Sequence, residues 1–401
     1  MAPMCHAAVV PPIEPIAPPP VVGMVGAGQL ARMTHQAAIG LGVPLRVMAA
    51  APDDGAARVS PSVALGDPHA GADLARFAAE VDVLTFDHEL VDLDALGALE
   101  AAGTVARPSA RALTYATDKA HQRRRLTAAG IPVPRHALIA DGADLERLGA
   151  EVGWPLVLKT ARGGYDGRGV WLVDDLDAAV AVVDAVRGDQ PAAVVLAEAA
   201  VAIRHELAVL VATRPDGTSV GYAPVETVQV AGICREILVP APLPSAVLAE
   251  AEAVARRVAA EVRAVGILAV ELFWDGTRIL VNEVATRPHN SGHWTIEGAV
   301  TSQFANHLRA VADLPLGSTA PLTPVAVCAN VLGAADGRDP RDHLAGALAV
   351  PGASVHLYGK GPRPGRKIGH VTVLGDHLDE VRDRAARAVA ALGDPVPGRP
   401  T

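Results

Sequence analysis

The order of short apolar runs and helical patterns constrains the fold of this chain more than any other sequence feature. The apolar run from Val21 to Val25 ends in a glycine-rich turn, and a helical pattern follows it as far as Ala38. Further apolar runs occupy 45–50 and 81–86, with a helical pattern over 73–80 between them. Strands that alternate with helices indicate a parallel α/β sheet. We expect this first unit to end near Pro108.

The rest of the chain continues as mixed α and β structure. We predict helices over 117–129 and 246–264, and strands over 155–159, 170–173, 194–198 and 206–213. Two further strands, 268–274 and 278–284, flank Asp275-Gly276, which is a strong hairpin signal. After Pro315 the pattern predicts a smaller β-rich region.

A chain of 401 residues is too long for one core, because single cores stop growing beyond roughly 250–300 residues. We therefore predict three folded units: a Rossmann-like domain over 21–116, an α+β core over 117–315, and a small β-rich domain over 316–401. Residues 1–20 are rich in proline, and we interpret them as a disordered extension.

Charge and cysteine content narrow the possible partners. A net charge of −9 disfavours nucleic acid as a partner. We interpret the run Arg123-Arg124-Arg125 as the solvated face of a helix. The three cysteines lack metal-ligand spacing and fit a reducing cytoplasm. No apolar run approaches the roughly 18 residues that cross a bilayer, so we expect no membrane partner.

The first glycine-rich turn reads Gly26-x-Gly28-x-x-Ala31, close to a dinucleotide fingerprint. The acidic residue expected at the end of the second strand is missing, which disfavours a nicotinamide cofactor and a dehydrogenase. A helix N-terminus after such a turn favours a phosphate-bearing substrate at its amides. A tight packing turn is the alternative.

The second glycine-rich segment runs from Gly163 to Gly169 and holds four glycines, with Lys159 shortly before it at the end of a strand. A plain hairpin turn needs fewer glycines, whereas the amides of a flexible loop can close over phosphates. Lys159 would supply a point charge for phosphate oxygens. We therefore predict a phosphate-binding flap.

The predicted hairpin carries Glu271 on one arm and Asn282-Glu283 on the other. Magnesium that bridges nucleotide phosphates is usually held by one or two carboxylates. A two-residue turn would put Glu271 and Glu283 on opposite faces. We therefore predict a bulged, odd-length loop over 275–277 that makes them diagonal neighbours about 7–8 Å apart on one face.

Two polar segments follow the hairpin. The run Arg287-Pro288-His289-Asn290-Ser291-Gly292-His293 is rich in hydrogen-bonding side chains, and a plain polar loop is the alternative to a binding role. Near the C-terminus, a basic cluster collects Lys360, Arg363, Arg366, Lys367 and two histidines. In an acidic protein this cluster suggests capture of a phosphate monoester, and a solvated surface patch is the alternative.

These motifs, in this order, resemble the ATP-grasp family, and most closely its 5-(carboxyamino)imidazole ribonucleotide synthase branch. The resemblance runs from about Val21 to about Leu374. Its most specific pieces are Lys-Thr-x-x-Gly-Gly-Tyr-Asp-Gly-Arg-Gly from Lys159, Asn-Glu-x-x-x-Arg-Pro-His-Asn-Ser-Gly-His from Asn282, and Tyr358-Gly359-Lys360 with the basic residues after it. By this resemblance, residues 117–315 would form the ATP-grasp domain.

The resemblance also implies which residues form the site. The ATP-binding residues would be Lys119, Lys159, Gly164, Tyr165, Asp166, Gly167, Arg168, Gly169, Glu198, Val201, Glu206, Asn282 and Glu283. The substrate-binding residues would be Gln29, Leu30, Glu89, Tyr165, Arg168, His293, Lys360, Arg366 and Lys367. Arg287, Lys159 and Asp166 would be catalytic, and Glu271 and Glu283 would hold Mg²⁺.

The implied reaction joins bicarbonate to the amine of aminoimidazole ribonucleotide through carboxyphosphate, with ATP consumed, in a cytoplasmic homodimer. Phosphoryl transfer needs positioning and cation clamping more than a covalent nucleophile. The alternatives are another ATP-grasp ligase, such as a formate-using type, or an inactive nucleotide-binding module. The presence of Lys159, Glu271, Asn282, Glu283 and Arg287 speaks against the inactive module.

The sequence departs from the family pattern at two segments. Phe86-Asp87-His88-Glu89-Leu90 stands where the family usually has Tyr-Glu-x-Glu-Asn, and this difference bears on the substrate end of the site. Glu226-Thr227-Val228-Gln229 stands where Glu-Asn-x-His is expected near the nucleotide.

Overall fold

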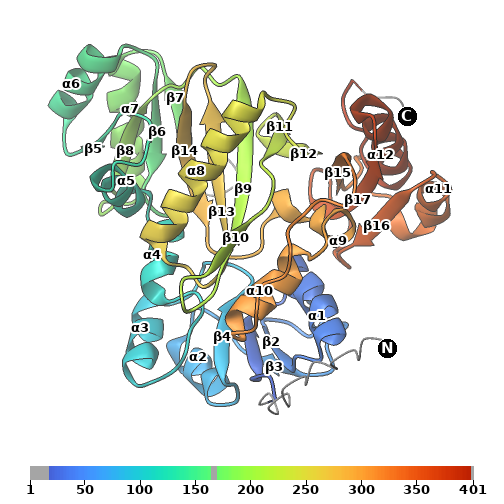
Figure 1. Ribbon diagram of the computed structural model, residues 1–401. Helices are drawn as coiled ribbons and strands as arrows, with labels where there is room; N and C mark the ends of the chain where they lie inside the picture. The colour runs from blue at the N-terminus through green and yellow to red at the C-terminus, as the bar shows by residue number, and fades with distance from the viewer. Residues whose placement is uncertain (1–17, 164–168, 399–401) are drawn as a thin grey trace, which may run out of the picture.

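The computed structural model describes residues 18–163 and 169–398, and its N-terminal unit is a four-stranded parallel sheet. The strand order is β3-β2-β1-β4, formed by β1 (Val22–Val25), β2 (Leu45–Ala49), β3 (Val63–Leu65) and β4 (Val83–Phe86). Its helices are α1 (Gln29–Leu41), α2 (Gly71–Ala78), α3 (Leu93–Ala101) and α4 (Ala110–Thr117). The predicted parallel α/β unit is confirmed, and it forms the lower part of Figure 1.

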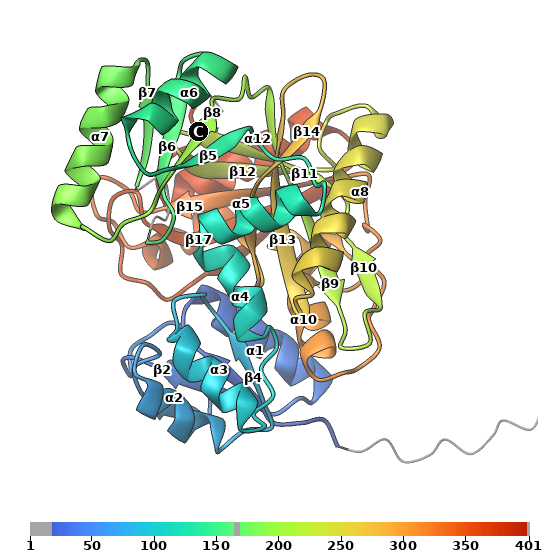
Figure 2. The same ribbon diagram turned by 90° about the vertical axis from the view of Figure 1, so that its left-hand side faces the viewer.

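The middle of the chain forms a second, antiparallel sheet with two helices on one face. Its strand order is β5-β8-β6-β7, with β5 (His136–Ile139), β6 (Leu156–Thr160), β7 (Val170–Val173) and β8 (Val195–Ala199). The helices α6 (Gly142–Val152) and α7 (Leu176–Asp189) cover one face of this sheet. Helix α5 (Lys119–Ala128) follows α4 and links this unit to the N-terminal one (Figure 2). We call the second sheet the lid sheet.

The third sheet has nine strands and runs from the centre of the molecule into the C-terminal region. Its order is β14-β13-β9-β11-β12-β15-β17-β16, with β10 paired to β9. The strands are β9 (His205–Thr213), β10 (Ser219–Gly221), β11 (Val225–Val230), β12 (Ile233–Val239), β13 (Gly266–Trp274), β14 (Ile279–Ala285), β15 (Val325–Leu332), β16 (Ala353–Leu357) and β17 (Lys367–Gly375). We call this nine-stranded sheet the central sheet. The C-terminal strands β15, β16 and β17 extend it. A domain boundary at 315/316 therefore stays a proposal.

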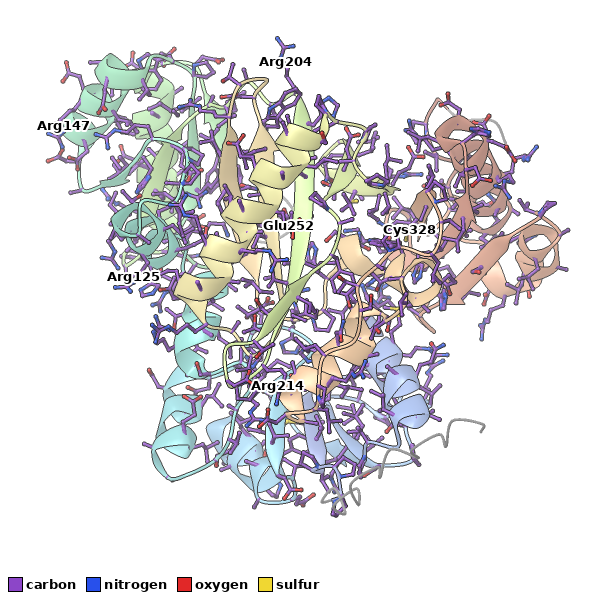
Figure 3. All side chains as sticks on the ribbon, in the orientation of Figure 1. Arg125, Arg147, Arg204, Arg214, Glu252 and Cys328 are labelled. Carbon is purple, nitrogen blue, oxygen red and sulfur yellow. The ribbon has the colours of Figure 1, made fainter. Side chains whose placement is uncertain are left out.

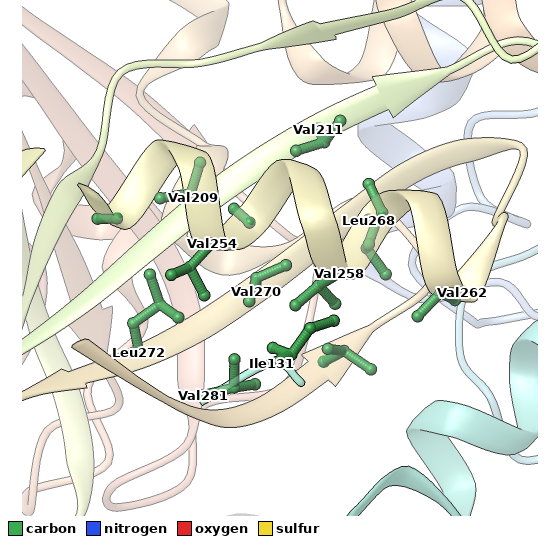
Figure 4. Close-up of a cluster of buried hydrophobic side chains, with 14 of the residues drawn as sticks. Ile131, Val209, Val211, Val254, Val258, Val262, Leu268, Val270, Leu272 and Val281 are labelled. Carbon is green, nitrogen blue, oxygen red and sulfur yellow. The ribbon is translucent and has the colours of Figure 1, made fainter. Parts of the chain in front are cut away.

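Aliphatic packing holds the central sheet to α8 (Ser245–Val262), as expected for a chain with only 3% aromatic residues. Val254, Val258 and Val262 face Val209 and Val270 of the sheet in one buried cluster (Figure 4). Burying each such side chain stabilises the fold by about 1.5–3 kcal/mol.

The C-terminal helices complete the fold. Helix α12 (Leu378–Leu392) packs on β15 and β17, with α11 (Leu344–Leu348) and a short 3₁₀ helix (Pro340–His343) beside it. Helix α9 (Thr295–Gly298) and a 3₁₀ turn (Asn290–Gly292) precede α10 (Gln303–Val311). Leu308 and Val311 of α10 belong to the core of the N-terminal unit, although they lie far from it in sequence. No helix within residues 18–163 and 169–398 is long and apolar enough to cross a membrane.

The hairpin corrects the predicted bulged three-residue loop, but it confirms that Glu271 and Glu283 share one face. Trp274 pairs with Ile279, so the loop has four residues rather than three. The Asp275 side chain accepts hydrogen bonds from the amides of Thr277 and Arg278, at 2.9 and 3.0 Å, which closes the four-residue turn. The register shifts inside β14 instead, and this shift sets Glu271 directly opposite Glu283.

Candidate active site

Three carboxylates share one face of the central sheet. Glu271 on β13 faces Glu283 on β14 and Ala208 on β9. Glu206 is two residues from Ala208, and alternate strand residues share a face, so Glu206 joins the pair. Burial, then Glu271 and Glu283, raise the pKa of Glu206 to about 7. Burial and the neighbouring Glu271 also raise the pKa of Glu283.

The opposed pair Glu271 and Glu283 fits a divalent cation. Their mutual repulsion is the kind that a bound cation relieves, and Mg²⁺ takes one or two carboxylates when phosphates supply further oxygens. No group of three or more His, Cys, Asp or Glu side chains in the described chain is placed to hold a metal ion by itself. His289 lies beside the pair, with its Nε2 3.2 Å from Glu271 Oε1. Burial would raise the pKa of Glu271, but its hydrogen bond with His289 contributes to a net lowering.

Lys159 is held between the lid sheet and the central sheet. Its Nζ lies 2.7 Å from Glu198 Oε2 and 3.5 Å from Asn282 Oδ1 on β14. On the other side of the carboxylate, Arg123 Nε lies 2.5 Å from Glu198 Oε1. Burial alone would raise the pKa of Glu198, but Arg123 and Lys159 lower it to about 2. The buried carboxylate thus stays charged and positions both cations.

The interpretation of the arginine run as a solvated helix face is wrong for Arg123. Its side chain is only 2% exposed, and it also donates to the Asn282 carbonyl oxygen at 2.6 Å and to Gln122. Arg124 is exposed, and Arg125, in the last turn of α5, lies at the outer surface, where it pairs with Glu261 (Figure 3). Helical periodicity could not distinguish these arginines, because Glu198 lies 75 residues away in sequence.

Arg287 lies at the end of the hairpin, paired with the N-terminal unit. Its Nε is 2.7 Å from Glu89 Oε2, and Glu89 Oε1 accepts from the Thr286 amide at 3.2 Å. Burial would lower the pKa of Arg287, but Glu89 keeps it raised, so the guanidinium stays charged. Arg287 therefore carries a fixed positive charge close to the carboxylate pair.

A cavity of about 270 Å³ opens beside Arg287. Its lining comes from the start of α1, the end of β4, the hairpin end and the C-terminal region: Gly28, Gln29, Leu30, Asp87, His88, Arg287 and Lys360. The ammonium of Lys360 donates a hydrogen bond to the side-chain oxygen of Gln29 across it. A larger hollow of about 420 Å³ near β2 contains none of the predicted site residues.

The amides at the start of α1 are already occupied. Asp87 accepts hydrogen bonds from the Gly28 amide at 2.6 Å and from the Ala31 amide at 2.8 Å. A carboxylate there disfavours a second anion at these two amides. The assignment of this helix start to a phosphate therefore stays a prediction, with two of its amides taken by Asp87. Gly26, with φ +98, leaves room for Asp87, because a Cβ at this position would lie 2.9 Å from the Asp87 Cβ.

The structure does not place every predicted residue at the cavity. His293 is fully buried and does not line the cavity; its Nδ1 accepts a hydrogen bond from the Gln303 side-chain amide, and its ring packs against Tyr358 and His370. Arg366 is exposed and Lys367 begins β17, and neither lines the cavity. Gly164, Tyr165, Asp166, Gly167 and Arg168 lie outside the described residues.

The remaining predicted ATP-binding residues surround the face that carries Lys159. Lys119 begins α5, and its charge opposes the raised pKa of Glu283. Val201 follows β8 and is half-buried. Gly169, with φ +72, accepts from the Thr160 amide at the far end of the flap.

Sequence reasoning missed the open face of the lid sheet. Register places Val157, Val170 and Leu172 on the same face as Lys159 and Glu198. Helices α6 and α7 cover the opposite face, which leaves Leu172 65% exposed. The signal was the alternation along β7, in which Val170 and Leu172 are exposed while Trp171 and Val173 pack into the core. Such a face provides a flat apolar surface next to the lysine.

A lid sheet and a central sheet that enclose a buried lysine and paired carboxylates define an ATP-grasp ligase. Three family models match in the same order along the chain. They are a ribonucleotide synthetase preATP-grasp domain at 20–117, an ATP-grasp domain at 124–304, and a phosphoribosylaminoimidazole carboxylase C-terminal domain at 326–384.

The chain belongs to the N5-carboxyaminoimidazole ribonucleotide synthase family. It is 50% identical over 376 residues to the enzyme of that name from Mycobacterium tuberculosis, covering 92% of this chain and 87% of the relative. It is similar to the Thermus thermophilus synthetase structure (36% identity, TM-score 0.83, 94% and 99% coverage). It is also similar to an Aspergillus clavatus synthase solved with ADP and 5-aminoimidazole ribonucleotide (32% identity, TM-score 0.84, 93% and 98% coverage).

Proposed function

We propose that this chain carboxylates 5-aminoimidazole ribonucleotide with bicarbonate in an ATP-dependent reaction of de novo purine biosynthesis. The products are N5-carboxyaminoimidazole ribonucleotide, ADP and phosphate. The observation that carries the proposal is the cavity at the start of α1: Arg287 lines it, and the charge of Arg287 also acts on Glu271 of the carboxylate pair. A ribonucleotide in that cavity would place its amine next to the phosphoryl-transfer site.

ATP would bind between the lid sheet and the central sheet. The apolar side chains of Val157, Val170 and Leu172 offer a face for the adenine ring, with Val201 at its edge. Lys119 and Lys159 would contact the phosphates, and Glu206 would accept from the ribose. Residues 164–169 would close over the phosphates and exclude water, which a labile intermediate requires.

The chemistry has two steps. Bicarbonate oxygen attacks the γ-phosphorus of ATP, the bond to the bridging oxygen breaks, and carboxyphosphate and ADP result. The amine nitrogen of the ribonucleotide then attacks the carboxyl carbon, phosphate leaves with the bonding electrons, and the nitrogen loses one proton. Arg287 would hold negative charge that develops on the transferring group, because its pairing with Glu89 fixes it there.

Magnesium would be held by Glu271 and Glu283, with Asn282 assisting. When bound, the ion supplies charge neutralisation for the phosphate oxygens. The direct opposition of the two carboxylates supports this assignment, since an uncompensated pair would remain mutually repulsive.

Gln29, Leu30 and Lys360 would bind the ribonucleotide in the cavity. The exposed Arg366 and the adjacent Lys367 would attract its phosphate. Tyr165 and Arg168 would also contact the ribonucleotide, and Asp166 would be a catalytic residue. Glu89 would act through Arg287, and the buried His293 would support the wall. We expect the enzyme to work in the cytoplasm as a homodimer, which light scattering of the purified protein would test.

ADP release by purified protein tests the proposal directly. With ATP, magnesium and bicarbonate present, adding 5-aminoimidazole ribonucleotide should stimulate ADP release strongly. ATP binding without any stimulation would keep the ATP-grasp assignment and reject this substrate. A formate-using ligase would instead respond to formate and a different amine.

A further inference from the structure

His88 is a residue of the cavity wall that the family pattern does not specify. It stands at the variable position of the segment Phe86-Asp87-His88-Glu89-Leu90. Its two neighbours are both engaged, since Asp87 caps α1 and Glu89 pairs with Arg287. His88 itself is half-buried and lines the cavity between these two fixed contacts.

The backbone of the glycine-rich turn holds the His88 ring in place. A Cβ atom at Gly26 would lie 3.0 Å from Cδ2 and 3.1 Å from Nε2 of the ring. This edge of the imidazole therefore rests directly over Gly26, which has φ +98 and no side chain to displace it. The absence of a side chain at Gly26 thus makes room for the His88 imidazole in the cavity wall.

The hydrogen-bonding capacity of the ring is unused within the described chain. Nδ1 is covered and has no hydrogen-bond partner among the described residues. A neutral imidazole provides one donor and one acceptor. Because Nδ1 is covered whereas Nε2 is not among the covered unpartnered atoms of the described chain, a ligand in the cavity would reach the ring at Nε2 and supply a hydrogen-bond partner there.

The charges around the ring favour its neutral form. Burial lowers the pKa of His88, and nearby Asp87 and Glu89 oppose that shift, whereas His69 and Arg287 add to it. Lys360 also lines the cavity and adds positive charge on that side. A neutral ring beside two cations is suited to an uncharged part of a ligand, and the cations are suited to its phosphate.

We propose that His88 is a substrate-binding residue that hydrogen-bonds the uncharged ribose or aminoimidazole part of the ribonucleotide. The inference rests on the proposed function and deepens it. It assigns the phosphate to Lys360 and the basic residues after it, and the uncharged part to the β4 end of the cavity. His88 would then distinguish the ribonucleotide from other phosphate esters of similar charge.

Steady-state kinetics of three variants test this assignment. His88→Ala removes both nitrogens, whereas Asn and Gln at this position place an amide near the former Nδ1 and Nε2 respectively. His69→Ala is the matched control, since His69 is an exposed histidine nearby that does not line the cavity. Each variant is measured for the KM of ribonucleotide, the KM of ATP and kcat.

We expect His88→Ala to raise the KM of the ribonucleotide about five- to tenfold, the effect of one lost neutral hydrogen bond. The KM of ATP should stay within about twofold, and one of the two amide variants should recover most of the loss. His69→Ala should match wild type in all three quantities.

Three results would overturn the inference. They are an unchanged ribonucleotide KM in His88→Ala, a parallel rise in the KM of ATP, and failure of both amide variants to recover binding. If His88→Ala is insoluble, the comparison of the Asn and Gln variants decides. Wild-type protein without ribonucleotide-stimulated ADP release would instead reject the proposed function itself, so the two failures are distinguishable.

Discussion

Replacing Arg123 with methionine should destabilise the protein strongly, although a charged residue in a run of three arginines looks replaceable. Methionine keeps most of the aliphatic stem and removes the guanidinium. The change deletes the hydrogen bonds to Glu198, Gln122 and the Asn282 carbonyl oxygen, all at 2.5–2.6 Å. Glu198, which is only 2% exposed, contacts two cations, Arg123 and Lys159, and after the change it keeps only Lys159 of these two.

Removing one partner of a buried ion pair costs about 3–5 kcal/mol. Because Lys159 still contacts Glu198, we expect the lower end, about 3 kcal/mol. Urea unfolding followed by tryptophan fluorescence measures it, since Trp154 and Trp171 pack in the lid-sheet core. Arg124→Met is the matched control, because Arg124 is exposed, and it should change stability by less than about 0.5 kcal/mol.

The pH dependence provides a second check on the same pair. The pKa of Glu198 is lowered to about 2 in the folded protein against an ordinary 4.5. A lowered carboxylate pKa contributes stability that is complete above pH 4.5 and lost as the pH falls towards 2. The difference between wild type and Arg123→Met should therefore shrink over that window. Equal stability of the Arg123 and Arg124 variants at pH 7 would refute the buried-pair reasoning.

Three further predictions concern metal binding, substrate binding and the joint between units. Glu283→Gln should lower turnover at least about 100-fold by removing a metal ligand, whereas Glu252→Gln on the outer face of α8 should not; wild-type-like turnover would reject the magnesium assignment. Lys360→Met should raise the KM of ribonucleotide about tenfold and leave that of ATP unchanged, and an unaltered ribonucleotide KM would remove this lysine from the site. His307 of α10 joins the N-terminal unit to the central sheet, because its Nε2 lies 2.8 Å from the Thr85 hydroxyl of β4. Burial lowers the pKa of His307 to about 3. Its stabilising contribution is therefore complete above pH 6.5 and falls by about 2 kcal/mol at pH 5. Urea midpoints at both pH values should show a smaller acid loss in His307→Asn, and an identical loss would contradict this.

Local sequence signals were sufficient for most elements and for the class of chemistry. The alternation of apolar runs and helices predicted the parallel N-terminal sheet, and the runs on either side of the glycine-rich segment predicted β6 and β7. The shared face of Glu271 and Glu283 was predicted from the need for two carboxylates on one side, but as diagonal neighbours rather than as a directly opposed pair. The register shift within β14 that sets the two carboxylates opposite each other could not be predicted from the sequence. A four-residue turn and a strand bulge leave no distinct local pattern.

Long-range contacts decided the rest of the site. The sequence by itself determined which side chains were available: the lysine, the carboxylates, the arginines and the glycine turns. Only the tertiary structure decided that Asp87 occupies the α1 amides, that Arg123 is buried against Glu198, and that Lys360 meets Gln29. Each of these contacts joins residues at least 59 positions apart. Their burial and charge state depend on which sheets and helices pack together, and this information is not contained in local periodicity.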